Sequence, residues 1–174
     1  MLADDVIRLE PIGQEHLDGL AALGQDPLVL RNTRVPEPWP EGFERTWVEA
    51  YERGRQDGTR DGYAIVDAES GAFLGIAGVV DLEQGANQGE IGYALVSEAR
   101  GRGIATRALE LVTRHALEEL GLERVELRIG TENIASMRVA ERGGYRREGV
   151  LRSLYVKPGR REDFVVYSRL PGDG

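Results

Sequence analysis

The sequence predicts an α/β fold, a single domain in which helices cover both faces of one mixed sheet. The predicted elements run strand, two helices, three strands, helix, strand, helix and two strands, which is about seven strands and four helices. Between residues 90 and 129 a strand, a long helix and a strand follow so closely that the two strands should be parallel. The 174 residues suit one domain, and no internal repeat or linker interrupts them.

The first 55 residues predict one strand and two helices. Val6 to Leu9 alternates as a short strand, and Gln14 to Leu23 places its leucines on one helical face. Pro27 is expected to interrupt the chain there. Arg31 to Pro40 holds several prolines and should be a stiffened loop, either a lid over a substrate or a packed connector. A second helix is predicted at about Gly42 to Arg55.

Three strands and a long helix should follow. The strands are predicted at Tyr63 to Val66, Phe73 to Leu82 and Glu90 to Val96, and their short, turn-forming connections favour an antiparallel meander. The segment from Arg102 to Leu120 repeats apolar residues at helical spacing, and Gly121 should end that helix.

The C-terminal third repeats the alternation of strand and helix. Val125 to Ile129 alternates as a strand, and Ile134 to Arg142 is predicted to be a helix that Gly143 and Gly144 stop. The stretches Tyr145 to Val156 and Phe164 to Leu170 should be the last two strands.

The amino-acid composition excludes several kinds of catalytic and metal site. The chain has no cysteine, which excludes disulfides and a thiolate nucleophile and favours a cytoplasmic location. His16 and His115 are its only histidines, too few for a multi-histidine metal site, and both are expected on helix surfaces. A signal peptide starts with a basic region, whereas this chain carries Asp4 and Asp5 there, so no signal peptide is expected. No apolar run approaches the ~20 residues that a membrane span needs.

The charge distribution bears on the partners. The net charge is −8, with the acidic excess in residues 1–137 and a basic excess in residues 138–174. An acidic body suits a cationic substrate better than a nucleic acid, although a solvated acidic surface that serves solubility explains most of these charges equally well. The basic last third could help to hold a phosphate-bearing ligand.

The most informative stretch is Arg100 to Ala105, which reads Arg-Gly-Arg-Gly-Ile-Ala between a predicted strand and a predicted helix. A glycine-bearing turn at a helix start presents unpaired backbone N–H groups at the positive end of the helix dipole, which favours a bound phosphate. An ordinary turn is the alternative interpretation. The stretch is neither a Walker A loop, since no Gly-Lys-Ser/Thr follows, nor a good dinucleotide motif, since Thr106 stands at the third glycine position.

Three stretches together resemble one family. They are Glu-Ile-Gly-Tyr-Ala-Leu at 90–95, Arg-Gly-Arg-Gly-Ile-Ala-Thr at 100–106, and Asn-Ile-Ala-Ser with a trailing Glu-Arg-Gly-Gly-Tyr between 133 and 145. In this order they resemble the GNAT superfamily of acyl-CoA-dependent N-acyltransferases, specifically its RimJ/RimL-type branch, which acetylates the N-termini of ribosomal proteins. The resemblance covers about residues 6–170 of a single domain. It implies the GNAT fold, whose central parallel strands splay apart.

The resemblance implies acetyl-CoA as co-substrate and no metal. The loop should bind the coenzyme A pyrophosphate, the strand end should pair with the pantetheine arm and polarise the thioester carbonyl, and the asparagine should contact that arm. The implied cofactor-binding residues are Leu95, Val96, Arg100, Gly101, Arg102, Gly103, Ile104, Ala105, Thr106 and Asn133. Asn133 could equally be a plain helix cap.

The implied mechanism is direct attack of a neutral amine on the thioester, without an acyl-enzyme. Glu90 is the candidate base, acting through water, and Ser136 is the candidate acid for the leaving sulfur. Family members that use a tyrosine acid carry it seven residues after the asparagine, where this chain has Ala140. Glu90 could instead be a strand residue that faces solvent, and Ser136 a helix residue without a catalytic role.

The resemblance favours a protein or peptide N-terminal α-amine as the acceptor. Arg34 and Trp39 are the expected substrate-binding residues, because substrate choice should reside in Arg31 to Pro40 and the C-terminal hairpin. A small-molecule amine, such as a polyamine or an antibiotic, and a catalytically weak acyl-CoA sensor remain alternatives. Neither nucleic acid nor membrane is an expected partner, and a homodimer is one possible assembly.

Overall fold

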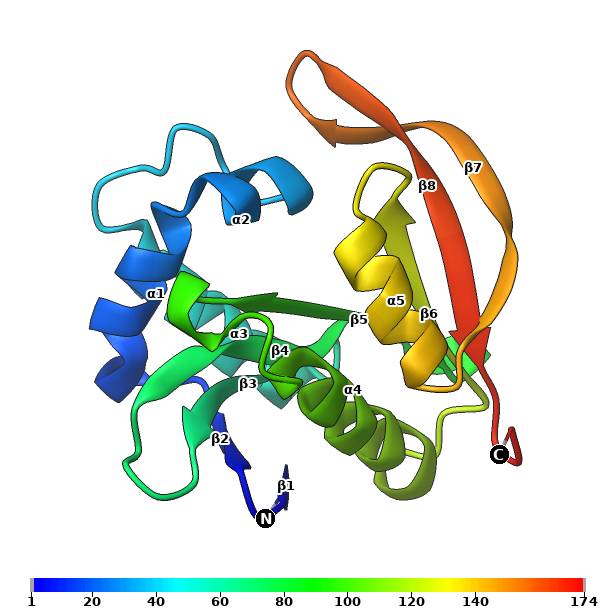
Figure 1. Ribbon diagram of the computed structural model, residues 1–174, viewed down its shortest axis with the longest axis horizontal. Helices are drawn as coiled ribbons and strands as arrows, with labels where there is room; N and C mark the ends of the chain where they lie inside the picture. Colours follow the sequence, from blue (N-terminus) through cyan, green and yellow to red (C-terminus); the bar gives the residue numbers. More distant parts are fainter. Residues whose placement is uncertain (1, 174) are drawn as a thin grey trace.

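The computed structural model describes residues 2–173, whose strands form one mixed eight-stranded sheet (Figure 1). The strands are β1 Leu2–Ala3, β2 Ile7–Pro11, β3 Asp61–Asp67, β4 Phe73–Glu83, β5 Gln88–Leu95, β6 Arg124–Gly130, β7 Arg146–Lys157 and β8 Arg160–Arg169. Their order across the sheet is β1-β2-β3-β4-β5-β6-β8-β7. Only β5 and β6 pair in parallel, and the other neighbours are antiparallel. The predicted α/β class and mixed sheet are confirmed.

Helices cover both faces of this sheet. They are α1 Leu17–Gly24, α2 Pro27–Asn32, α3 Phe43–Asp57, α4 Ile104–Arg114 and α5 Ile134–Arg142. Helices α1, α2 and α3 pack on one face, while α4 and α5 pack on the other. Strand β3 shows the alternation that creates the two cores: Tyr63 and Ile65 face α4, whereas Ala64 and Val66 face α1 and α3. No helix within residues 2–173 is long and apolar enough to cross a membrane.

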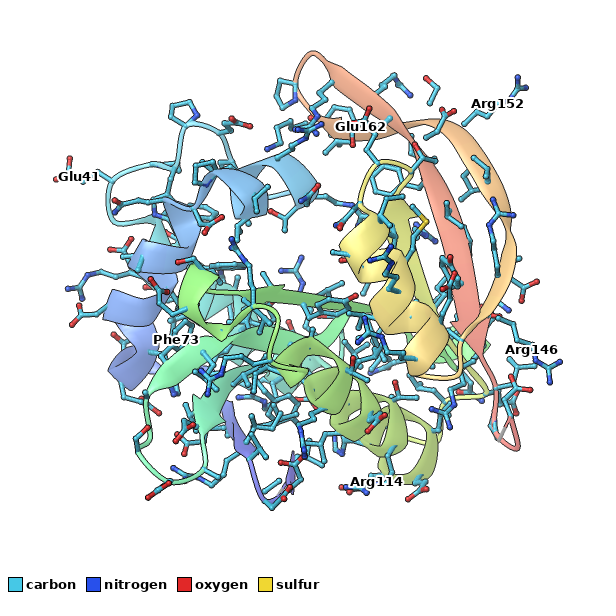
Figure 2. The ribbon with its side chains drawn as sticks, viewed as in Figure 1. Glu41, Phe73, Arg114, Arg146, Arg152 and Glu162 are labelled. Atoms are coloured by element: carbon cyan, nitrogen blue, oxygen red, sulfur yellow. The ribbon has the colours of Figure 1, made fainter. Side chains whose placement is uncertain are left out.

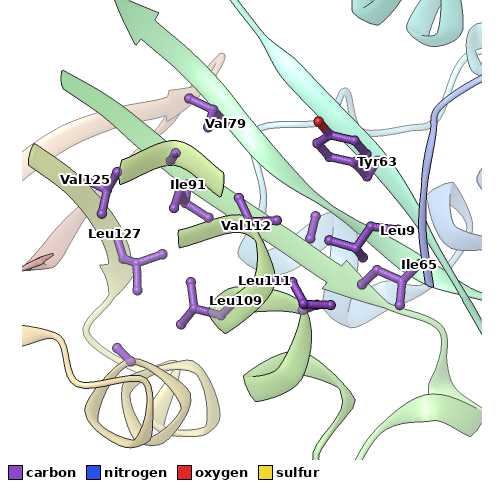
Figure 3. Packing of buried hydrophobic residues seen from close by; sticks show 14 of the residues in the cluster. Leu9, Tyr63, Ile65, Val79, Ile91, Leu109, Leu111, Val112, Val125 and Leu127 are labelled. Atoms are coloured by element: carbon purple, nitrogen blue, oxygen red, sulfur yellow. The ribbon is translucent and has the colours of Figure 1, made fainter. Parts of the chain in front are cut away.

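The larger core lies under α4 (Figure 3). Leu109 and Val112 of α4 are fully buried in the same cluster as Ile91 of β5 and Val125 and Leu127 of β6. These contacts remove the apolar stripe of α4 from water. Burial of apolar surface is the main favourable contribution to folding. Because α4 packs across β5 and β6, it also holds in place the strands that form the site.

The parallel strands β5 and β6 stay together only briefly. Their register pairs residues 88–90 with residues 124–126 and then ends. Beyond that point β5 continues beside β4, up to the pair of Leu95 with Gly75, while β6 continues beside β8, up to the pair of Gly130 with Phe164. The central strands therefore diverge, as the family resemblance implied, and leave a gap in the sheet's ladder.

Two short elements were not predicted. Strand β1, with two residues, raises the strand count to eight. Helix α2 makes a fifth helix and begins at Pro27, the residue expected to interrupt the chain. Proline is tolerated in a first helical turn, and Asp26 caps this helix by accepting hydrogen bonds from the backbone of Leu28 (2.8 Å) and Val29 (3.1 Å).

The expectation that both histidines lie on helix surfaces is wrong. His16 is buried, and its Nδ1 accepts a hydrogen bond from the Gly13 amide at 3.2 Å. The side chain of His115 is only 12% exposed, and its Nε2 lies 2.8 Å from Asp61 Oδ2. That hydrogen bond, together with the charge of Asp61, raises the pKa of His115 despite its burial.

Candidate active site

A cavity of about 840 Å³ occupies the region where β5 and β6 diverge. Strands β4 and β5 line one side, β6, β8 and α5 line another, and α2, α3 and the loop between them complete it. The predicted site residues that line it are Arg34, Glu90, Leu95, Arg100, Gly101, Ala105, Asn133 and Ser136. Trp39, Val96, Arg102, Gly103, Ile104 and Thr106 do not line it. The fold thus gathers most of the predicted residues around one space.

Two contacts join the sides of the cavity across its top. Lys157, at the end of β7, donates hydrogen bonds to the Leu30 carbonyl at 2.6 Å and to Glu37 Oε2 at 3.0 Å. Arg31 at the end of α2 pairs with Glu132 in the loop before α5 at 2.6 Å. Residues of the N-terminal half therefore contact the C-terminal hairpin and the α5 loop, which lie opposite α2 in Figure 1.

The glycine loop has the backbone conformation that a helix-start anion site needs. Gly101 and Gly103 have φ angles of +72° and +78°, a region that L side chains rarely adopt, and a Cβ at either would meet nothing within 4 Å. Helical hydrogen bonding begins with Arg107 N–H to Gly103 O at 3.2 Å. Within residues 2–173, no protein group accepts from the backbone N–H of residues 101–106. These amides are available to a ligand at the positive end of α4.

Arg100, one of the implied cofactor-binding residues, has its charge paired within the protein. Its guanidinium lies 2.7 Å from Asp26 Oδ2 and donates to the Leu95 carbonyl at 2.8 Å. Burial alone would raise the pKa of Asp26, but hydrogen bonds from Arg100 and the α2 backbone lower it overall. Arg100 thus joins the loop to the capped start of α2, and Arg102 is the exposed arginine of this stretch.

The edge of β5 offers different amides from those predicted. The Val96 N–H donates to the Leu74 carbonyl at 3.0 Å, so it is paired with β4 and not free for a pantetheine arm. Because backbone groups alternate along a strand, the amides of Leu95 and Tyr93 point the opposite way, toward the diverging β6. The Leu95 prediction agrees with this geometry. The amide of Tyr93 faces the gap as well, whereas that of Val96 does not.

Helix α5 places Ser136 on the cavity. Asn133 caps the helix, its Oδ1 accepting from the Ser136 N–H at 3.2 Å, so the capping interpretation of Asn133 holds in this structure. Tyr93 of β5 donates its hydroxyl to the Ser136 carbonyl at 3.3 Å. Burial raises the pKa of Tyr93 to about 12, so this hydroxyl is protonated at neutral pH. Tyr93 therefore ties β5 to the first turn of α5 across the gap.

Glu90 is not a solvent-facing strand residue. Its side chain is 10% exposed, and both carboxylate oxygens accept from Arg34 Nη2, at 3.1 and 3.2 Å. Arg128 Nη1 of β6 lies 3.6 Å from Glu90 Oε2. Burial raises the pKa of Glu90 more than the two arginines lower it. A carboxylate with a raised pKa beside a cavity is suited to accepting a proton.

Trp39 belongs to the packing of the N-terminal helices. Its ring contacts those of Phe43 and Trp47 edge-on, with centroids 5.0 and 5.5 Å apart, and lies against Gly24. The packed-connector interpretation therefore describes Trp39, whose side chain does not reach the cavity. Trp47, one helical turn into α3, is the tryptophan that lines it.

The sequence did not single out Arg128, Tyr93 or Lys157. In the sequence, Arg128 belongs to the polar face of an alternating strand and Lys157 to a strand end. Their contacts at the cavity, with Glu90 and Glu37, join positions that are far apart in the chain. Only Tyr93 had a local signal, since it falls inside the Glu-Ile-Gly-Tyr stretch that carries the resemblance.

The diverging strands and the glycine loop before a helix are the features that the resemblance to the GNAT superfamily implied. A family model described as "Acetyltransferase (GNAT) domain" matches residues 7–146, and the chain belongs to this family. The probable N-acetyltransferase YjcK of Bacillus subtilis is 34% identical over 134 residues, which are 76% of this chain and 74% of that protein.

Two solved structures of different specificity share the fold. RimL, a ribosomal L7/L12 α-N-protein acetyltransferase, has a TM-score of 0.85 at 21% identity, covering 96% of this chain and 91% of RimL. Spermidine N-acetyltransferase from Vibrio cholerae, in complex with CoA and spermine, has a TM-score of 0.83 at 18% identity and covers 96% of each chain. The chain is an N-acetyltransferase. The two solved structures show that its fold occurs both in an enzyme named for a protein substrate and in one named for a polyamine.

Proposed function

We propose that this protein transfers the acetyl group of acetyl-CoA to the α-amine of a protein or peptide N-terminus. The observation that carries the proposal is one cavity that reaches both ends of β5. Near the C-terminal end of the strand are the Leu95 amide and the glycine loop, and near its start is Glu90. A phosphate-bearing thioester and an amine can therefore approach the same strand from opposite ends.

The residues present fit the co-substrate. Free amides of residues 101–106 suit the pyrophosphate, and the amides of Tyr93 and Leu95 face the gap where a pantetheine arm could pair with the strand. Backbone donors at that edge would stabilise the oxyanion that develops when the thioester carbonyl is attacked. Arg102, Ile104, Ala105 and Thr106 contribute through this loop and helix start, and Asn133 through the helix it caps.

Two side chains have proposed roles in proton transfer. Glu90 removes a proton from the attacking amine, directly or through water, and its raised pKa suits that task. Ser136 delivers a proton to the departing sulfur. Ser136 and Glu90 line the same cavity from different elements, α5 and β5.

The charges of the cavity favour an α-amine over a polyamine. Of its acidic residues, Glu90 is paired with two arginines and Glu162 with Arg160, so few carboxylates are free to bind a polycation. An α-amine with a pKa of about 7.7 to 8.0 is also neutral far more often at pH 7 than a lysine amine near 10.4. It therefore needs only a modest base.

A release assay for coenzyme A thiol tests this proposal. Amidated peptides, spermidine and simple amines are each incubated with acetyl-CoA or succinyl-CoA, with the Glu90→Gln variant as the comparison. We expect rapid release with acetyl-CoA and peptides, and slow release from the variant. If acetyl-CoA raises the melting temperature but no amine releases thiol, the protein is an acyl-CoA sensor. If spermidine is the best substrate, the polyamine alternative is correct.

A further inference from the structure

The guanidinium of Arg34 is only partly used within the protein. It lies in the irregular segment between α2 and α3, and its side chain is 47% exposed although it lines the cavity. Nη2 alone donates to both oxygens of Glu90. Within residues 2–173, no acceptor contacts its Nε or Nη1. Arg34 therefore keeps donors on a planar fork, which is the geometry that binds a carboxylate through two parallel hydrogen bonds.

The cavity differs in charge from the rest of the chain. The chain carries a net charge of −8, yet more arginines than acidic residues line the cavity. The arginines are Arg31, Arg34, Arg60, Arg100 and Arg128, and the acidic residues are Asp81, Glu90 and Glu162. Arg31 and Arg100 are paired with Glu132 and Asp26, which do not line it. With those two charges neutralised, the positive groups left for a negatively charged part of a ligand include the partly exposed guanidinium of Arg34.

Glu90 has a second cation nearby, Arg128, although the Nε and Nη2 of that arginine bind Glu126, at 2.8 and 2.7 Å. Arg128 Nη1 is 3.6 Å from Glu90 Oε2, on the opposite side of the gap from Arg34. If Arg34 turned to another carboxylate, Glu90 would keep a nearby positive charge and would not become an isolated buried anion. It would also lose the donor that now occupies both of its oxygens, which leaves those oxygens able to accept a proton.

Building on the acetyl transfer proposed above, we propose that Arg34 binds a carboxylate carried by the amine substrate. Arg34 then gives up its hydrogen bonds to Glu90, which frees Glu90 to act as base. The amine nitrogen bonds to the acetyl carbonyl carbon as the carbon–sulfur bond breaks. The amine proton passes to Glu90, and the coenzyme A thiolate takes the hydroxyl proton of Ser136. Ser136 then regains a proton from solvent, to which Glu90 releases its own. The substrate class is thus an amine with a carboxylate a few bonds away.

Two sources share this chemistry. One is a peptide N-terminus whose first residue is aspartate or glutamate, and the other is a free amino acid with its own α-carboxylate. Matched pairs of substrates separate them. An amidated peptide that begins with Asp is compared with the same peptide that begins with Asn, and alanine is compared with alaninamide.

The measurement is the ratio of kcat/KM within each pair, corrected for the neutral fraction of each amine. A charged hydrogen-bonded pair contributes about 1.5 to 3 kcal/mol, so we expect the carboxylate partner to be preferred by roughly 10- to 100-fold in at least one pair. Arg34→Met should bring that ratio close to one, and Arg34→Lys should leave an intermediate ratio because it keeps the charge without the fork. If Arg34→Met also changes the basicity of Glu90, it changes kcat/KM for both substrates of a pair equally, and the ratio is unaffected.

The matched control is Arg114→Gln. Arg114 is exposed at the end of α4 and projects from the outer surface (Figure 2), so this variant removes one positive charge without touching the cavity. It should keep the wild-type ratio. A preference in the peptide pair alone, or in the amino-acid pair alone, supports the proposal and identifies the source of the carboxylate.

Equal kcat/KM for acidic and neutral partners in both pairs would overturn the role of Arg34 and leave the acetyltransferase proposal intact. A carboxylate preference that Arg34→Met does not change would also overturn it, because another group would then bind the carboxylate. If neither pair is acetylated and other amines are inert too, the proposed function fails as well.

Discussion

The two ends of the cavity, at which we propose that acetyl-CoA and the amine bind, are built differently. At the acetyl-CoA end, the groups offered to a ligand are backbone amides of one continuous stretch, residues 101–106, with the amides of β5 beside them. At the amine end, they are side chains from separate segments: Arg34 from the loop after α2, Glu90 from β5 and Arg128 from β6. A local sequence can encode the first kind of site, whereas only the complete fold assembles the second.

We expect the largest effect from Gly103→Val, which breaks the backbone site. A β-branched side chain at φ +78° would stand where an anion must approach the amides. At 100 times its dissociation constant a ligand adds about 2.7 kcal/mol of stability, and the variant should lose this stabilisation by acetyl-CoA. Thermal unfolding with and without acetyl-CoA measures it.

Gly121→Val is the matched control for that change. Gly121 has a φ of +70°, and its Cβ position is equally open, but it follows the C-terminal end of the same helical segment. Both variants carry a similar backbone strain, and only the change at Gly103 should abolish the ligand-induced shift. If acetyl-CoA binds the Gly103 variant normally, the loop is not the phosphate site.

The second largest effect should come from Ser136→Ala. The Ser136 backbone N–H, not its hydroxyl, makes the capping bond to Asn133, so the variant should keep its stability. Loss of a general acid lowers kcat by roughly 10²-fold, while acetyl-CoA affinity should change little. Single-turnover kinetics at saturating acetyl-CoA isolate the chemical step. A wild-type rate there would assign the proton to water or to another hydroxyl.

A pH profile sharpens the description of the amine end. Burial raises the pKa of Glu90 and Arg34 lowers it, so Arg34→Met should raise it further. Since a base must be deprotonated to act, the acid limb of kcat should move to higher pH in this variant when a neutral peptide is the substrate. Arg34→Lys should move it less. An unchanged acid limb in Arg34→Met would mean that Glu90 is not the titrating base.

The smallest effect should be on stability, outside both ends of the cavity. The pKa of His115 is raised in the folded protein by its hydrogen bond to Asp61. The stabilisation of the folded state by protonated His115 is therefore fully present below the unfolded pKa of about 6.5 and is lost as the pH rises through the pKa of the folded state. His115→Gln should cost about 1 to 2 kcal/mol at pH 6 and less at pH 9. Denaturant unfolding at the two pH values measures this difference, and an equal cost at both would refute the ionic contribution.

The difference between the two ends of the cavity also explains which features the sequence could predict. The order of strands and helices, the parallel pair and the glycine loop follow from local patterns and turn residues. Helix α2 and strand β1 are too short for a periodic signal. Arg100 was assigned to phosphate because its contact with Asp26 spans 74 residues of sequence, and Trp39 was assigned to substrate because loop position does not reveal packing against Gly24. Glu90 and Arg34 were both identified, but their pairing was not, and neither was Arg128.

The most direct test is the site of acetylation on one peptide with two amines. We choose an amidated peptide with an N-terminal aspartate and one internal lysine, incubate it with acetyl-CoA and the wild-type protein, and locate the added acetyl group by tandem mass spectrometry. We predict acetylation of the α-amine, with little on lysine and little product from Gly103→Val. Modification mainly on the lysine amine would contradict the proposed function.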